Sequence, residues 1–145
     1  MTIAIRPFVA TDYDAAVALW READGVVLRA ADDRAPLLAY IERNARLSFV
    51  AEDDGRIVGA VLCGTDGRRG YLQHLAVSGT HRRRSIGRRL AEHCVDALAR
   101  QGIDKCHLMV LVTNTAAQAF WSRIGWAARP DVQLMSHIAS GLPTA

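Results

Sequence analysis

The spacing of apolar residues along the chain predicts several short β-strands. Residues 2–8 alternate between apolar and polar side chains, which is the period of a strand with one buried face. Asp54-Gly55 and Asp66-Gly67 are strong signals for tight turns, and they separate three further strands that we expect to pair antiparallel. These three strands are expected at 48–52, 56–64 and 70–78. Residues 105–112 are almost continuously apolar and predict a central strand that is buried on both faces.

Four other segments carry apolar residues at the spacing of an amphipathic helix. These segments are 11–24, 32–45, 85–100 and 115–124. The first and the last open with capping boxes, Thr11-Asp-Tyr-Asp14 and Thr115-Ala-Ala-Gln118, and Gly102 supplies a C-terminal cap for the third. The segment that follows them, 126–138, has room for one or two short strands.

The elements therefore follow the order β-α-α-β-β-β-α-β-α-β. The strand–helix–strand unit at 70–112 predicts a parallel pair with a crossover helix, whereas the earlier strands are antiparallel. We expect an α/β fold in which a mixed sheet of six or seven strands carries helices on both faces. A single domain spanning 1–145 accounts for the length, and a chain of this size buries a core without disulfides.

Positive charge is concentrated in one short region. The net charge of +3 does not by itself imply nucleic acid, but five arginines fall within eight residues, at 82–84 and 88–89. Such a cluster suits an anion, whether phosphate, nucleic acid or acidic lipid. A solvated helix start explains the same charges equally well.

Cysteine usage and the N-terminus bear on the cellular compartment. The three cysteines, Cys63, Cys94 and Cys106, form no CxxC pair and sit among apolar residues, so we expect buried free thiols in a reducing cytosol and no metal site. The N-terminus lacks the pattern of a signal peptide, and no apolar run reaches membrane-spanning length. We expect a soluble cytoplasmic protein with no membrane partner.

The stretch from 72 to 90 carries the most chemical information. A strand ends near Val77, a basic turn follows, and a helix begins near Ser85. The first main-chain N–H groups of a helix have no partners within it and attract anions together with the helix dipole. Small residues at Ser85 and Gly87 let a phosphate approach, and arginines add contacts from the rim. The pattern is neither a Walker A loop nor a Rossmann fingerprint, and it suggests a pyrophosphate site.

Two motifs in this chain resemble those of the GNAT superfamily of acetyltransferases. Arg82-Arg-Arg-Ser-Ile-Gly87 is similar to the family's coenzyme A loop, Q/R-x-x-G-x-G/A, and Leu75-Ala-Val77 before it matches the family's fourth strand. Asn114-Thr-Ala-Ala-Gln-Ala-Phe-Trp-Ser-Arg-Ile-Gly-Trp126 is similar to N-x-x-A-x-x-F-Y-x-x-x-G-F. The element order is also the family's, so the resemblance covers nearly the whole chain. Within the family, the chain looks like small bacterial proteins of the YpeA type.

The resemblance implies acetyl-CoA as cosubstrate and a set of residues that bind it. They are Leu75, Ala76, Val77, Arg82, Arg83, Arg84, Ser85, Ile86, Gly87, Arg88, Asn114, Ala117 and Phe120. Main-chain N–H groups of 83–87 would hold the pyrophosphate, and the pantetheine arm would lie in a splay between the fourth and fifth strands. A main-chain N–H there could polarise the thioester carbonyl.

The chain departs from the family pattern in two places. Ser85 replaces the first loop glycine, and we expect it to be tolerated there with an ordinary helical backbone. Trp121 replaces the tyrosine that acts as general acid in the family, and an indole N–H can only donate. It could still hydrogen-bond the sulfur, while solvent or another group protonates the thiolate.

No carboxylate stands at the positions where relatives place a general base, which here are Tyr71 and Met109. His74 is the best titratable group nearby, since imidazole works near neutral pH, although its side chain could face away from the site. Tyr71 is the other candidate, as a base through water or as a substrate contact. Asp32 could reach an amine, because the resemblance implies that the first two helices form the wall of the acceptor site, but a helix cap is the stronger interpretation.

The sequence therefore predicts an N-acetyltransferase that transfers the acetyl group of acetyl-CoA to a primary amine of a small molecule or protein. A non-catalytic acyl-CoA-binding module is one alternative, because Trp121 replaces the tyrosine. A nucleic-acid-binding protein using the Arg82–Arg89 cluster is another, although the cluster has no interleaved aromatic residues. We expect no nucleic-acid partner, and the sequence leaves a homodimer open.

Overall fold

Five strands form one mixed sheet with the order β1-β2-β3-β4-β5. The computed structural model describes residues 2–82 and 84–143. The strands are β1 (Ile3–Pro7), β2 (Phe49–Asp53), β3 (Arg56–Thr65), β4 (Gly70–Val77) and β5 (Cys106–Leu108). The first four pair antiparallel and β4 pairs with β5 in parallel, which confirms the predicted pairing. The α/β class is also confirmed, with five strands where six or seven were expected.

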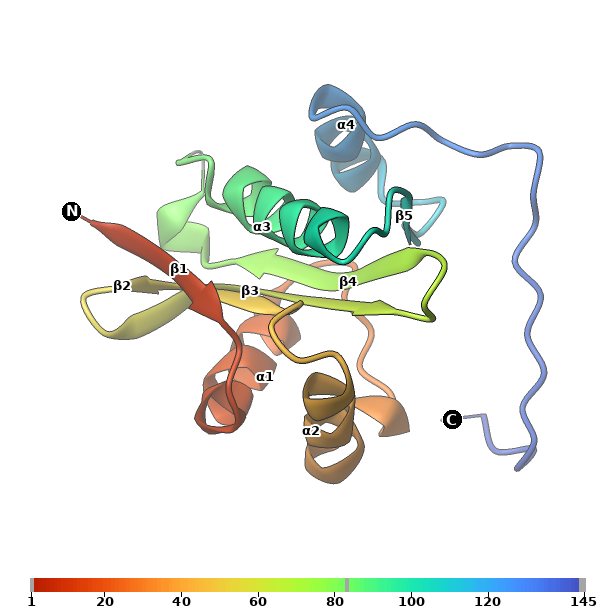
Figure 1. The fold of residues 1–145 in the computed structure, drawn as a ribbon, viewed down its shortest axis with the longest axis horizontal. Helices are drawn as coiled ribbons and strands as arrows, with labels where there is room; N and C mark the ends of the chain where they lie inside the picture. The colour runs from red at the N-terminus through yellow and green to blue at the C-terminus, as the bar shows by residue number, and fades with distance from the viewer. Residues whose placement is uncertain (1, 83, 144–145) are drawn as a thin grey trace.

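Helices cover both faces of this sheet, as Figure 1 shows. They are α1 (Tyr13–Glu22), α2 (Arg34–Arg43), α3 (Ile86–Arg100) and α4 (Thr115–Arg123). The helices α1 and α2 lie on one face, and α3 and α4 lie on the other. Short 3₁₀ turns precede α1, α2 and α3 at Ala10–Asp12, Ala30–Asp32 and Gly79–His81. The helix α3 is the crossover between β4 and β5.

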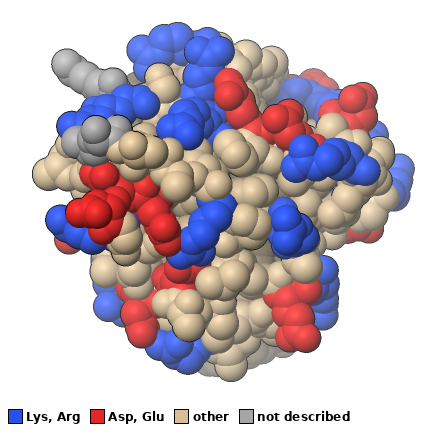
Figure 2. Space-filling model, turned by 60° about the vertical axis from the view of Figure 1, so that its left-hand side comes forward, with Lys and Arg blue, Asp and Glu red and all other residues tan. Residues whose placement is uncertain are grey.

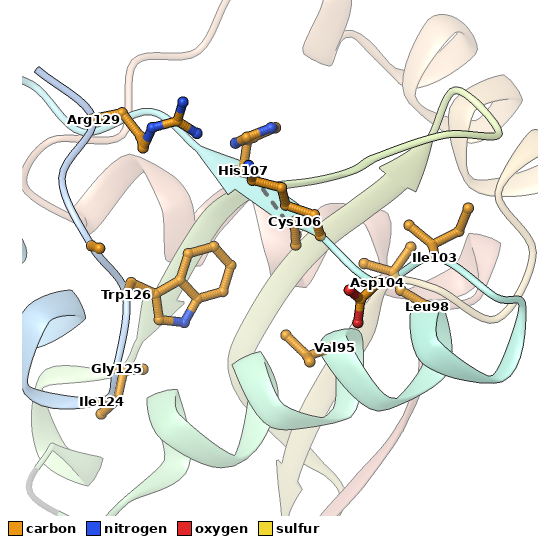
Figure 3. Close-up of a pocket in the computed structure, with 12 residues that line it drawn as sticks. Val95, Leu98, Ile103, Asp104, Cys106, His107, Ile124, Gly125, Trp126 and Arg129 are labelled. Carbon is orange, nitrogen blue, oxygen red and sulfur yellow. Dashed lines mark hydrogen bonds between the residues drawn. The ribbon is translucent and has the colours of Figure 1, made fainter. Parts of the chain in front are cut away.

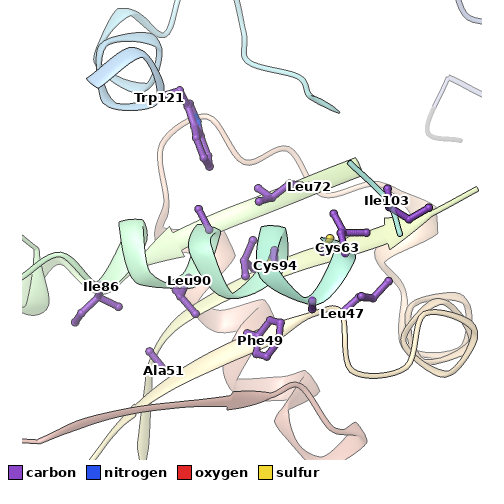
Figure 4. Packing of buried hydrophobic residues seen from close by; sticks show 14 of the residues in the cluster. Leu47, Phe49, Ala51, Cys63, Leu72, Ile86, Leu90, Cys94, Ile103 and Trp121 are labelled. Carbon is purple, nitrogen blue, oxygen red and sulfur yellow. The ribbon is translucent and has the colours of Figure 1, made fainter. Parts of the chain in front are cut away.

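Each face of the sheet buries its own apolar cluster, because strand side chains alternate between the two faces. On the α3 face, Ile86, Leu90 and Cys94 press against the strands, and Trp121 reaches down from α4 (Figure 4). On the α1 face, the largest fully buried side chain is Trp20. The amphipathic pattern of 85–100 therefore predicts the packing of α3 correctly.

A β-bulge interrupts the pairing of β3 with β4 and decides which residues reach the site. Ala60 pairs with Ala76 and Leu62 pairs with Gln73, so Val61 stands opposite two residues, His74 and Leu75. His74 takes up the extra residue with φ of 55°, in the left-handed region. A bulge turns the strand and re-aims its side chains. No turn residue or glycine marks this position in the sequence.

The strand predicted at 105–112 is wrong in length and place. It is three residues long, half-buried, and lies at the edge of the sheet. Met109 is 65% exposed and Val112 90% exposed, so the apolar run does not continue as a buried strand. No strand forms at 126–138 either, and the chain there runs clear of the sheet (Figure 1). An apolar run is compatible with an edge position, because composition does not say how many neighbours a strand has.

The predicted helix caps are shifted at α1 and α4. The Asp12 carboxylate accepts from the N–H of Val9 and pairs with Arg6, so it caps the turn before α1 rather than lying inside a capping box at Thr11. Burial opposes ionisation of Asp12, but the hydrogen bonds from Arg6 and Val9 outweigh it and lower the pKa of this carboxyl. At α4 the cap is Asn114, one residue before the predicted Thr115.

Candidate functional site

The strands β4 and β5 separate after a short paired stretch. Their register runs from Gly70 opposite Cys106 to Leu72 opposite Leu108 and then stops. Beyond that point β4 continues to Val77 with β3 along one edge, and no strand within the described residues pairs with its other edge. Unpaired main-chain N–H and C=O groups along such an edge can bind an extended ligand. This open edge leads directly to the turn before α3.

The start of α3 is closely packed beneath α4. Ile86 and Gly87 are buried in the first turn of the helix. A Cβ at Gly87 would lie 3.3 Å from Cζ of Phe120 and 3.7 Å from Cδ2 of Leu75. The structure therefore brings together three residues predicted to bind the cofactor, from α3, α4 and β4. Any side chain at Gly87 would fill the space between these three elements.

The expectation of an ordinary helical backbone at Ser85 is wrong. Ser85 has φ of 60° and ψ of 18°, the left-handed conformation. Glycine adopts this conformation without steric cost. In other residues Cβ comes too close to the carbonyl oxygen, and this repulsion makes the conformation unfavourable. The glycine of the family pattern would adopt this conformation without strain, whereas the backbone of Ser85 is strained.

We expect Ser85→Gly to relieve that strain. The gain in the free energy of unfolding should be up to about 1 kcal/mol, since the cost of the left-handed conformation exceeds the extra chain entropy of glycine only slightly. Thermal unfolding measures the change, and Ser140→Gly in the exposed tail serves as the control for chain entropy. A loss of stability in Ser85→Gly larger than in Ser140→Gly would contradict the assignment of strain.

A buried histidine anchors the turn before α3 to the neighbouring hairpin. His81 Nε2 lies 2.7 Å from Oδ2 of Asp53, at the end of β2, and its Nδ1 lies 2.8 Å from Oγ1 of Thr80. Both ring nitrogens are therefore occupied. Through these two contacts His81 holds the loop in place. Its partner Asp53 was not anticipated, because no local spacing links the two residues.

A second histidine–carboxylate pair lies on the opposite face of β4. His74 Nε2 is 2.9 Å from Oδ1 of Asp32, which ends the 3₁₀ turn before α2. The imidazole also packs on Trp20, with ring centroids 5.3 Å apart. Because of the bulge, His74 faces α1 and α2, the elements that the family resemblance assigns to the acceptor.

Asn114 lies between α4 and the loop that follows α1. Its Oδ1 accepts from the N–H of Ala117 at 3.0 Å, so the side chain caps α4. A Cβ on Gly25 would lie 2.4 Å from Nδ2 of Asn114, so only glycine fits there. This contact joins the α1–α2 loop to the start of α4. Sequence reasoning missed Gly25, since a lone glycine in a loop has many explanations.

Tyr71 and Trp121 are the two other candidates for catalysis, and each is held by contacts with neighbouring side chains. Tyr71 lies where β4 is still paired with β5, with its hydroxyl 3.3 Å from Oδ2 of Asp66 in the β3–β4 turn. Trp121 is 9% exposed and its ring meets those of Phe120 and Trp126 edge to face. Of the two candidates on β4, only His74 lies beyond the last pair of β4 with β5.

The arginines predicted at the cofactor loop are mostly on the surface. Arg82, Arg84 and Arg88 are exposed, and Arg88 pairs with Glu92 along α3. Arg83 lies outside the described residues. On the face shown in Figure 2, basic side chains are interrupted by acidic groups rather than forming a continuous stripe. This pattern does not favour a long nucleic-acid backbone, which needs an extended basic surface.

A hollow on the surface is separate from these residues. It has a volume of about 350 Å³ and lies between β5, the end of α3 and the segment after α4. Figure 3 shows Trp126 and His107 on one side of it and Val95 on the other. None of the predicted cofactor residues lines it. The hollow lies beside β5, at the edge of the sheet.

The cysteine thiols are not activated as nucleophiles. Cys63 and Cys94 are buried and Cys106 is half-buried, and all three are free thiols. A hydrogen bond with Cys63 and burial both raise the pKa of the Cys106 thiol. Among the described residues, no cluster of His, Cys, Asp and Glu could hold a metal ion, and no helix has the length and apolarity to cross a membrane.

An open strand edge that leads to a helix N-terminus defines a protein that binds an elongated ligand with phosphate at one end. Comparison with known proteins agrees with this class. A model described as the acetyltransferase (GNAT) family matches residues 13–126. An acetyltransferase of Pectobacterium atrosepticum is 33% identical over 121 residues, which are 83% of this chain and 84% of the relative. The chain belongs to the GNAT family of acetyltransferases.

Two further comparisons bear on the fold and the relatives. The chain is 32% identical over 92 residues to N-alpha-acetyltransferase 30 of Schizosaccharomyces pombe, with 60% of this chain and 61% of the relative covered. The crystal structure of the paia N-acetyltransferase from Thermoplasma acidophilum in complex with coenzyme A superposes with a TM-score of 0.80. That structure shares 20% sequence identity and covers 89% of this chain and 92% of its own, so it supports the fold.

Proposed function

We propose that this protein transfers the acetyl group of acetyl-CoA to a primary amine. The observation that carries the proposal is that the open edge of β4 lies beside the buried glycine at the start of α3, where a Cβ on Gly87 would come within 3.7 Å of Cδ2 of Leu75. An extended pantetheine arm fits the edge of a strand, and a pyrophosphate fits the N-terminus of a helix. The nearness of this strand edge to the start of α3 supports the proposal.

The residues present fit a coenzyme A moiety. The first main-chain N–H groups of α3 lack partners within the helix, and Gly87 leaves room for phosphate oxygens to approach them. Leu75 and Phe120 give the path an apolar wall. Arg82, Arg84 and Arg88 supply positive charge at the surface near this helix end.

The bulge provides a reason for the reaction to occur at this place on β4. His74 and Leu75 stand outside the paired register, so main-chain groups at the bulge are released from the sheet ladder. A released N–H that points into the open edge could stabilise negative charge on the thioester oxygen as the amine attacks. The amine would enter from the α1 and α2 face, opposite the helix that binds the phosphates.

Trp121 is best explained as a packing residue. Its burial between Phe120 and Trp126 shelters the indole from solvent. We therefore propose that the leaving thiolate takes its proton from solvent. Direct transfer to the amine also suits this chain, because no activated thiol is available among the described residues to carry the acetyl group.

Turnover measured with a panel of amines tests the proposal. The panel should contain polyamines, free amino acids and peptides with free N-termini, the last because one relative is named as an N-alpha-acetyltransferase. Release of thiol that depends on both acetyl-CoA and an amine is the expected result. Tight coenzyme A binding without turnover on any amine would favour a non-catalytic acyl-CoA-binding module. Steeply salt-dependent RNA binding that coenzyme A does not compete away would favour nucleic acid instead.

A further inference from the structure

Two histidine–carboxylate pairs are sheltered from solvent, and they differ in the hydrogen bonding of the second ring nitrogen. The side chains of His74 and Asp32 are 16% and 12% exposed, and those of His81 and Asp53 are 12% and 17% exposed. His81 has a partner on each ring nitrogen. His74 is bonded through Nε2, and its Nδ1 has no hydrogen-bond partner in the part of the chain that is described.

The backbone of His74 is in a strained conformation. The residue lies at the extra position of the bulge with φ of 55°. Histidine is among the residues that tolerate this region, but the conformation is still strained. Strained backbone of this kind is concentrated at functional sites. The side chain is turned onto Trp20, two residues beyond the last pair of β4 with β5.

Asp32 is held so that it can fix the orientation of the imidazole. Its Oδ2 accepts from the N–H of Arg29 at 2.9 Å, and its carbonyl accepts from the hydroxyl of Tyr13 at 2.7 Å. Burial opposes ionisation of Asp32, but hydrogen bonds from His74 and from the N–H of Arg29 outweigh it and lower its pKa. An ionised carboxylate can only accept, so the proton of the neutral ring is on Nε2 and the lone pair is on Nδ1.

We infer that His74 is the proton acceptor of the reaction and that Asp32 is the residue that positions it. This inference rests on the proposed function. The amine nitrogen forms a bond to the acetyl carbon, the carbon–sulfur bond breaks, and the electron pair leaves on sulfur. One proton of the amine passes to Nδ1 of His74, and the coenzyme A thiolate takes a proton from solvent. His74 then returns its proton to solvent, so the products are the N-acetyl amine and the free thiol.

Few other charges lie around the pair. Arg34 lies over the ring of Tyr13, 4.6 Å from its centroid, and its guanidinium pairs with Asp14. Arg29 contacts Asp32 through its main chain. On the strand side, the bulge residues face Val61, and Trp20 covers the ring from α1. Asp32 is thus the charged group in direct contact with His74 among the described residues.

The test compares substitutions that the left-handed backbone accepts. Asparagine and glycine both tolerate this conformation, so His74→Asn and His74→Gly remove the imidazole without adding strain. We expect His74→Asn to lower kcat about 10²- to 10⁴-fold, the usual contribution of a general base. The acid limb of the kcat–pH profile should disappear with it. Imidazole added to His74→Gly should restore activity, which a purely structural histidine would not allow.

Asp32 and His81 provide the matched comparisons. Asp32→Asn should lower kcat and shift the acid limb, and Asp32→Glu should recover part of the activity because the carboxylate is kept. His81→Asn removes a histidine of similar burial, and we expect it to raise the KM for acetyl-CoA while the pH profile of kcat stays as in the wild type. Thermal unfolding confirms that each variant is folded.

The outcomes separate the two proposals. If the wild type turns over amines while His74→Asn keeps both kcat and the acid limb, the role of His74 is overturned and the proposed function stands. Loss of activity in His74→Gly without rescue by imidazole, together with an unchanged acid limb in Asp32→Asn, would also overturn it. No turnover by the wild type with any amine would overturn the proposed function and this inference with it.

Discussion

Gly87→Glu should abolish coenzyme A binding. The glycine lies in the first turn of α3, and a Cβ there would point at Phe120 and Leu75. A glutamate side chain would enter the same space and place a negative charge beside the pyrophosphate. Losing two hydrogen bonds to a charged phosphate, at about 1.5–3 kcal/mol each, corresponds to a Kd raised about 100-fold or more.

Calorimetric titration with coenzyme A measures this effect, and two controls separate its causes. Gly87→Gln has nearly the same volume without the charge, so the difference between the two variants reports repulsion of the phosphate. Ala99→Glu adds the same charge on the exposed side of α3, about 18 Å along the helix at 1.5 Å per residue. We expect Ala99→Glu to bind as the wild type does. An unchanged Kd in folded Gly87→Glu would remove α3 from the site.

Trp20→Ala should be the most destabilising single truncation on the α1 face. Trp20 is 0% exposed, its ring stacks on Phe8 with centroids 6.3 Å apart, and its other side contacts His74. Removing a buried aromatic side chain costs about 3–5 kcal/mol, since the cavity it leaves is only partly refilled. For a chain of this size the melting temperature should fall by about 10 °C or more.

Trp20→Phe isolates the part of this effect that comes from packing. The indole Nε1 of Trp20 is buried and has no hydrogen-bond partner among the described residues. Phenylalanine keeps a ring against Phe8 and His74 and removes that unsatisfied N–H, so we expect a much smaller loss of stability than in Trp20→Ala. Val27→Ala, at a residue that is 47% exposed, should change stability by less than about 0.5 kcal/mol. A loss in Trp20→Ala no larger than that of Val27→Ala would contradict the packing described for this face.

The sequence by itself determined most of the helices and strands and the class of fold, and it predicted where a phosphate would bind. Hydrophobic periodicity is a local property, so the helices at 85–100 and 115–124 and the four antiparallel strands were predicted close to their observed bounds. The loop at 82–87 was predictable because its signal, a short basic turn between a strand and a helix, is contiguous in the chain.

Only the tertiary structure decided which side chains of β4 face α1 and α2 and which partners they have there. The pairing of His74 with Asp32 joins segments that lie far apart in the sequence, and no glycine marks the bulge at His74 or the left-handed backbone of Ser85. The apolar run after Lys105 predicted a central strand, yet its place at the sheet edge depends on what lies beside it. Local spacing carries no information about such neighbours, and for this reason the histidine proposed as the proton acceptor could be named from the sequence but not oriented.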